Sequence, residues 1–185
     1  MNLWKKLLSG FSSKPGLDES RVYGGNVTGK YDGANERWMM RALDLASQAS
    51  NAGDVPIGAV VVRRDEVVTE AHNRRIIDGD PTAHAELLAI REAARALGDW
   101  RLTGCTMFVT LEPCCMCAGA IVLARMDRLV YGATDAKAGA VDTLYRICCD
   151  QRLNHQVEVV GGVLAESCGK ILTDFFALQR AKGKK

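Results

Sequence analysis

Two short segments of this chain carry the residue types best suited to chemistry. The first holds His84 and, two residues later, Glu86, and the second holds Cys114 and Cys117. An imidazole and two thiolates are one ligand short of a closed tetrahedral zinc site, and a catalytic zinc keeps its fourth position for water. Glu86 is a carboxylate that can take a proton from that water. The pattern therefore predicts a hydrolytic zinc enzyme.

The cysteine segment has the form of a helix start. Pro113 is suited to opening a helix, which places Cys114 and Cys117 three residues apart on one face of the first turn. The positive end of the helix dipole favours thiolates there. Cys115 points about 100° away from Cys114 around the helix, so we assign it to packing or to the surroundings of the ligands, and not to the metal. A pair of buried thiols is the alternative for Cys114 and Cys117.

The histidine segment predicts a second helix start. Asp80 suits a cap and the following proline suits the first turn, so we expect a helix over residues 81–97. His84 and Glu86 then lie in its opening turns. Residues two apart differ by about 200° around a helix and cannot share a face. Both side chains reach one metal only if the helix end points at it.

Four blocks of sequence extend this pattern. Residues 81–86 read PTAHAE, 109–120 read VTLEPCCMCAGA, 131–137 read YGATDAK and 174–176 read DFF. His-x-Glu together with Pro-Cys-x-x-Cys is the signature of zinc-dependent deaminases of bases and nucleosides. The four blocks together resemble the bacterial tRNA-specific adenosine deaminases, and the resemblance covers roughly residues 35–182.

The resemblance implies a fold, a reaction and partners. The fold is cytidine deaminase-like α/β, with a central mixed five-stranded sheet flanked by helices on both faces. The reaction is hydrolytic deamination of adenosine to inosine at the wobble position of a tRNA anticodon. One Zn²⁺ per subunit is held by His84, Cys114 and Cys117 in a homodimer. Two alternatives stay open: a deaminase of free guanine or cytosine, as base or nucleoside, and a non-catalytic zinc protein that binds RNA or an active subunit.

The resemblance also assigns six residues to the nucleotide: Val55, Pro56, Asn73, Ala85, Asp135 and Phe176. The Asn73 amide can donate to and accept from a purine edge. A turn-forming asparagine is the alternative for this position. Ala85 offers its backbone N–H to the base, while Val55 and Pro56 form an apolar wall.

The remaining assignments concern the rim of the pocket. Asp135 can accept a hydrogen bond from a 2′-OH, and Phe176 can contact the flipped nucleotide. At least one of Phe175 and Phe176 is expected in the core of the last helix. Glu112, beside the ligands, can hydrogen-bond around the loop.

Periodicity places the elements that position these residues. Apolar residues recur at helical spacing after Asn35, a possible cap, and Gly53 ends that helix. Strands alternating with helices predict a mixed sheet between helices. Residues 133–154 read as loop with a helical turn. The expected strands cover residues 57–63, 67–71, 106–111, 128–132 and 157–160, and the closing helix covers 166–181.

Length and composition limit the function classes. The 185 residues suffice for one packed α/β domain. No run of eighteen apolar residues is present, so no membrane span is expected. Seven cysteines, an odd number crowded in places, do not suggest a disulfide framework. With no credible signal peptide, they favour the reducing cytoplasm.

Charge and glycine content divide the chain. Residues 1–33 contain several glycines without a period, and we expect a disordered extension there. Residues 34–182 form the expected zinc deaminase domain, and 183–185 end a basic tail. The net charge is +2 over residues 1–33, −4 over 34–179 and +4 over 180–185. RNA binding must therefore use local basic patches and the tail.

Overall fold

The computed structural model describes residues 33–183. The predictions for residues 1–32 and for 184–185 lie outside the described residues. None of the helices within 33–183 is both long and apolar enough to cross a membrane. In chain order the elements are α2 (Gly33–Asn51), β1 (Gly58–Arg63), β2 (Glu66–His72), α3 (Arg75–Asp78), α4 (Ala85–Leu97), β3 (Cys105–Leu111), α5 (Cys115–Leu123), β4 (Arg128–Ala133), η1 (Ile147–Cys149), β5 (Glu158–Val160) and α6 (Ala165–Ala181).

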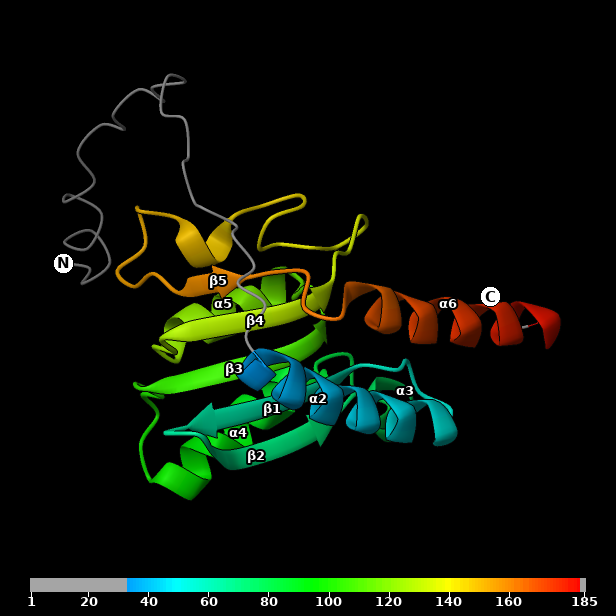
Figure 1. The fold of residues 1–185 in the computed structure, drawn as a ribbon, viewed down its shortest axis with the longest axis horizontal. Helices are drawn as coiled ribbons and strands as arrows, with labels where there is room; N and C mark the ends of the chain where they lie inside the picture. Colours follow the sequence, from blue (N-terminus) through cyan, green and yellow to red (C-terminus); the bar gives the residue numbers. More distant parts are fainter. Residues whose placement is uncertain (1–32, 184–185) are drawn as a thin grey trace, which may run out of the picture.

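The strands form one mixed sheet in the order β2-β1-β3-β4-β5 (Figure 1). β1 runs antiparallel to both β2 and β3, whereas β3, β4 and β5 run parallel. Arg64 and Asp65 form the tight turn between β1 and β2, and both have positive φ. The predicted mixed five-stranded sheet is confirmed.

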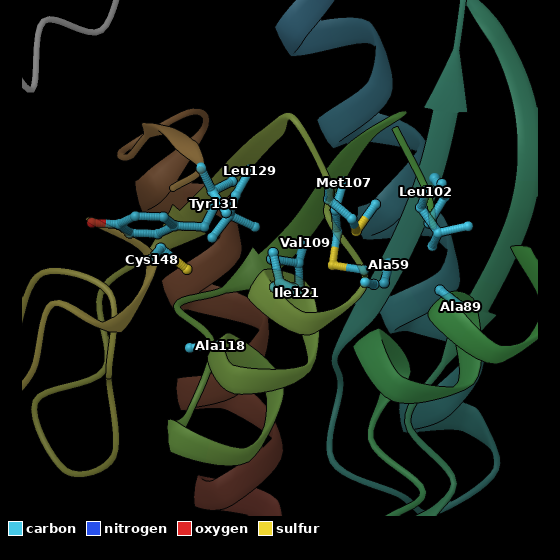
Figure 2. Close-up of a cluster of buried hydrophobic side chains, with 14 of the residues drawn as sticks. Ala59, Ala89, Leu102, Met107, Val109, Ala118, Ile121, Leu129, Tyr131 and Cys148 are labelled. Atoms are coloured by element: carbon cyan, nitrogen blue, oxygen red, sulfur yellow. The ribbon is translucent and has the colours of Figure 1, made fainter. Parts of the chain in front are cut away.

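Side chains on alternate strand positions enter two separate cores. In β1, Ala59 and Val61 belong to one cluster, while Val60 and Val62 belong to the other. Residues of α4 and α5 complete the first cluster, part of which Figure 2 shows around Met107. Residues of α2 and α6 complete the second. Burial on both faces explains why β1, β3 and β4 read as largely apolar runs, whereas β2 is partly exposed and carries several polar residues.

Two helix starts differ from the predicted ones. Asn35 lies buried inside α2, and its Oδ1 accepts a hydrogen bond from Arg128 at 3.1 Å instead of capping the helix. α4 begins at Ala85 rather than at residue 81. The Asp80 carboxylate accepts hydrogen bonds from the backbone N–H and the hydroxyl of Thr82, both at 2.7 Å. The capping side chain therefore serves a turn that precedes the helix.

One edge of the sheet gathers the segments that carry the candidate residues. β1 begins and β2 ends at this edge, since Gly58 pairs with His72. β3 ends there too, because Ala59 near the start of β1 pairs with Val109 near the end of β3. The parallel strand β4 ends beside it. The segments before β1 and after β2, β3 and β4 therefore meet, at a position where α/β folds commonly bind ligands.

Candidate active site

The N-termini of α4 and α5 bring the three predicted metal ligands together. His84 is the N-cap of α4, with φ −75° and ψ 147°, and Cys114 is the N-cap of α5. The Nδ1 atom of His84 lies 3.8 Å from the Sγ of Cys114 and 3.6 Å from the Sγ of Cys117. All three atoms fall within 4.8 Å of one another. The end of α4 points at this cluster, which is the condition that the spacing of His84 and Glu86 required.

The cluster fits one zinc ion. Around a tetrahedral zinc, with Zn–N near 2.0 Å and Zn–S near 2.3 Å, a nitrogen and a sulfur are roughly 3.5 Å apart. The His84 distances to the two sulfurs are close to that separation. Cys115 is not part of the cluster, in agreement with its assignment as a non-ligand, but its assignment to packing is wrong, because it is exposed.

The three groups perturb one another's protonation. Hydrogen bonding with Cys117 and His84 lowers the pKa of Cys114 to about 3. The same contact with Cys114 raises the pKa of His84. Hydrogen bonding to Cys114 and burial both raise the pKa of Cys117. The cluster alone thus favours a single thiolate, and a second one calls for the positive charge that a divalent cation supplies.

Glu86 lies beside these groups in the first turn of α4. Its side chain is buried, and burial raises the pKa of its carboxyl group. The Oε2 atom is buried without a hydrogen-bond partner among residues 33–183. A buried polar atom of this kind is costly unless a ligand or water satisfies it. The geometry therefore leaves one carboxylate oxygen available to a reacting group.

A cavity of about 540 Å³ opens beside the cluster. Four of the six predicted nucleotide contacts line it: Val55, Asn73, Asp135 and Phe176. Phe176 is 45% exposed and packs edge-on against the buried Phe175, with ring centroids 5.5 Å apart. Phe175 is thus the core member of this pair. Pro56 and Ala85 are buried and do not line the cavity. Use of the Ala85 N–H stays a prediction.

The cavity also includes residues that the sequence analysis missed. Arg75 of α3 lines it and makes no ion pair within residues 33–183. The neighbouring Arg74, in contrast, pairs with Asp78 at 2.7 Å. Leu172 and Thr173 of α6 add to the wall. The exposed Arg75 therefore adds a positive charge to the wall of the cavity.

Glu112 shapes the loop that follows β4. Its Oε2 accepts hydrogen bonds from the backbone N–H of Asp135 at 3.0 Å and from the hydroxyl of Thr143. A Cβ at Gly139 would collide with the same carboxylate, so only glycine fits there. Its Oε1 accepts three more bonds, at 2.8–3.1 Å, from the N–H groups of Val141, Asp142 and Thr143. The loop-bonding role expected for Glu112 is confirmed.

We expect Glu112→Gln to lower the free energy of unfolding at pH 7 by about 2–4 kcal/mol, because a buried charged acceptor loses its donors. Burial raises the pKa of Glu112, but these hydrogen bonds outweigh burial and hold the pKa below its ordinary value. The stabilisation is therefore complete above the ordinary pKa and is lost as pH falls through the folded value.

Urea unfolding of both proteins at pH 7 and at pH 4 checks this expectation. The difference between wild type and Glu112→Gln should shrink at the lower pH. The control is Glu92→Gln, which should change the stability little at either pH, because Glu92 is exposed and forms a surface ion pair with Arg95. A difference that grows on acidification would contradict the account of Glu112.

Comparison with known proteins identifies the family. The model of the MafB19-like deaminase family matches residues 34–180. The chain belongs to this family. A relative of the deaminase in Bacillus subtilis (strain 168), named "tRNA-specific adenosine deaminase", is 50% identical over 150 residues, which cover 81% of this chain and 93% of the relative. A relative of the same name in Haemophilus influenzae is 44% identical over 151 residues, which cover 81% of this chain and 87% of the relative.

Solved structures give the same result. The deaminase matches, with TM-score 0.71 and 43% identity, a chain from "Biochemical and Structural Studies of A-to-I Editing by tRNA:A34 Deaminases at the Wobble Position of Transfer RNA". The match covers 74% of this chain and 99% of the other. A guanine deaminase from Bacillus subtilis matches with TM-score 0.52 and 34% identity, and the match covers 59% of this chain and 80% of the other. The predicted deaminase fold is confirmed.

Proposed function

We propose that this deaminase hydrolyses adenosine to inosine at the wobble position of a tRNA anticodon. One observation carries the proposal. A His-Cys-Cys cluster beside a buried glutamate whose Oε2 lacks a partner among residues 33–183 lies in a chain that is 50% identical to a tRNA-specific adenosine deaminase. The likeness to a guanine deaminase is weaker in both identity and overlap, so the tRNA reaction is the better-supported one.

His84, Cys114 and Cys117 are the proposed zinc ligands. When bound, zinc acts as a Lewis acid that makes water nucleophilic near neutral pH. The imidazole binds through Nδ1, because that nitrogen faces both sulfurs. Cys114 and Cys117 lie at the start of α5, where the positive end of the helix dipole favours their negative charge.

Glu86 is the proposed proton carrier. It takes one proton from the attacking water and passes it to the ring nitrogen next to C6, while the water oxygen bonds to C6. It then moves the remaining hydroxyl proton to the amino group, and the C6–N bond breaks to release ammonia. One water is consumed, and the products are inosine and ammonia. Glu86 can serve both transfers because it lines the cavity proposed for the base and its Oε2 has no partner among residues 33–183.

The cavity walls suit an extruded nucleotide. Val55 and Phe176 offer apolar surface, Asn73 offers an amide, and Asp135 lies at the rim for a neighbouring ribose. Arg75 adds a cation suited to a phosphate. An anticodon loop already presents unpaired bases, which lowers the cost of extrusion.

Incubation of the zinc-loaded protein with total tRNA, followed by sequencing, tests the function. Inosine is read as guanosine, so the proposal predicts an A-to-G change confined to wobble positions, with an equal amount of released ammonia. Free guanine and free cytosine serve as competing substrates. Release of ammonia from guanine, with no change in any tRNA, would contradict the proposal.

We further propose a cytoplasmic homodimer. Large apolar side chains are exposed on α5 and on the segment after β4, as at protein interfaces: Leu123, Leu144, Tyr145 and Leu153. A reducing compartment protects the two cysteine ligands from oxidation, which favours the cytoplasm. Light scattering of the purified protein should give twice the chain mass of 20.1 kDa.

A further inference from the structure

Asp54 is a buried carboxylate beside the cavity that the reaction above does not use. It is fully buried in the turn between α2 and β1. Burial alone would raise its pKa, but the bonds that it accepts outweigh burial and hold the pKa below its ordinary value, so it is ionised. The donors are Asn73 Nδ2 at 2.7 Å, Val55 N at 2.8 Å, Ile76 N at 2.7 Å and Ile77 N at 3.1 Å.

The Asp54 charge determines which way the Asn73 amide points. An ionised carboxylate only accepts hydrogen bonds, so the NH₂ group of Asn73 must face it. The amide is planar, and its oxygen therefore lies on the side away from Asp54. That oxygen, Oδ1, is buried and has no partner among residues 33–183, although Asn73 lines the cavity. The amide thus turns an unsatisfied acceptor away from the carboxylate.

We propose that Asp54 is a positioning residue, which fixes the Asn73 amide so that its carbonyl oxygen receives a hydrogen-bond donor of the bound nucleotide. The inference rests on the proposed function, since it takes that nucleotide as the ligand. Asn73 Oδ1 and Glu86 Oε2 are the two buried side-chain atoms without a partner in the described part of the chain. Both lie in residues that line one cavity, and an unsatisfied buried acceptor favours a ligand that donates to it.

The same carboxylate also fixes α3. Its Oδ2 accepts from the backbone N–H groups of Ile76 and Ile77, which places the preceding residue, Arg75, at the cavity. Asp54 therefore holds two cavity residues through contacts that span 19 to 23 positions of sequence. Within residues 33–183, its carboxylate hydrogen-bonds to Val55, Asn73, Ile76 and Ile77 and to none of the proposed metal ligands.

A mutant cycle tests whether Asp54 acts through Asn73. The proteins are wild type, Asp54→Asn, Asn73→Ala and the double variant. Each is assayed with tRNA, and the concentration of active sites is taken from the zinc content of the protein. We expect Asp54→Asn to lower kcat per zinc-loaded site by about 10-fold to 100-fold, because its new NH₂ group lets the Asn73 amide turn over. KM for tRNA should change by less than about 3-fold, because Arg75, which Asp54 helps to place, is one cation among several that are expected to contact the phosphates.

The deciding result is the double variant. In the Asn73→Ala background, Asp54→Asn should lower kcat no further, while it still lowers Tm through the lost bonds to α3. If the loss of kcat in the double variant instead equals the product of the losses in the two single variants, the inference is overturned. Asp80→Asn is the matched control and should keep wild-type kcat, because the Asp80 carboxylate lies in a nearby turn and, within residues 33–183, hydrogen-bonds to Thr82 alone.

Two further outcomes are distinguishable. If wild type forms no inosine in tRNA, the proposed function fails and this inference falls with it. If wild type is active and Asp54→Asn leaves kcat unchanged, only the inference is overturned. Should Asp54→Asn melt below the assay temperature, Asp54→Glu takes its place in the same cycle, since it keeps the charge but displaces both oxygens.

Discussion

Replacing Glu86 with glutamine is expected to lower kcat by about 10²–10⁴-fold while the protein keeps its zinc and its fold. Glutamine has nearly the same volume and can occupy the buried place of Glu86 in α4. It cannot accept a proton from water or return one to the leaving amine. Glu86 is not one of the proposed ligands, so His84, Cys114 and Cys117 should still bind the metal in this variant. KM for tRNA should change little.

Three measurements separate this loss from damage to the protein. Zinc content should stay at one per chain, Tm should change by only a few degrees, and inosine formation should fall. Glu166→Gln supplies a matched control, because Glu166 also lies in the first turn of a helix but is exposed and outside the cavity. Near-normal turnover by Glu86→Gln with full zinc would show that another group carries the proton.

The ligand set and the sheet were predictable because their signals are local. His84 and Cys114 are N-caps, so a few neighbouring residues fix both their backbone conformation and the direction of the helix behind them. β1, β3 and β4 read as largely apolar runs because both of their faces are covered, and the turn at Arg64 and Asp65 separates β1 from β2. Short-range patterns were sufficient for these features.

Features that depend on distant contacts were missed or misplaced. The start of α4 was placed at residue 81 because Asp80 has a capping side chain, yet that side chain bonds Thr82 in a preceding turn. α3 is one turn long, too short to show a helical period. Asp54 meets Asn73 across 19 residues, and nothing local marks either partner. Such contacts arise only when strand ends converge at one sheet edge.

Replacing Cys117 with serine is expected to remove the metal and, with it, turnover. Cys117 is fully buried at the start of α5, and its Sγ lies 3.6 Å from His84 Nδ1. A serine hydroxyl is a poor zinc ligand because it stays protonated at neutral pH. Loss of a residue that only hydrogen-bonds to a metal ligand already lowers metal affinity about 10–100-fold. Loss of a direct ligand should therefore lower the zinc affinity by more than about 100-fold. Tm should fall as well, since metal bound only to the native state stabilises it.

The adjacent cysteine supplies the control for this variant. Cys115 is exposed and outside the ligand cluster, so Cys115→Ser should keep one zinc per chain, wild-type Tm and wild-type turnover. Zinc affinity measured by competition with a chelator, together with Tm with and without added zinc, checks both proteins. Added zinc should raise the Tm of wild type and Cys115→Ser but not that of Cys117→Ser. If Cys117→Ser instead binds zinc as tightly as wild type and forms inosine, Cys117 is not a ligand, and the structural assignment of the metal centre is wrong at that residue.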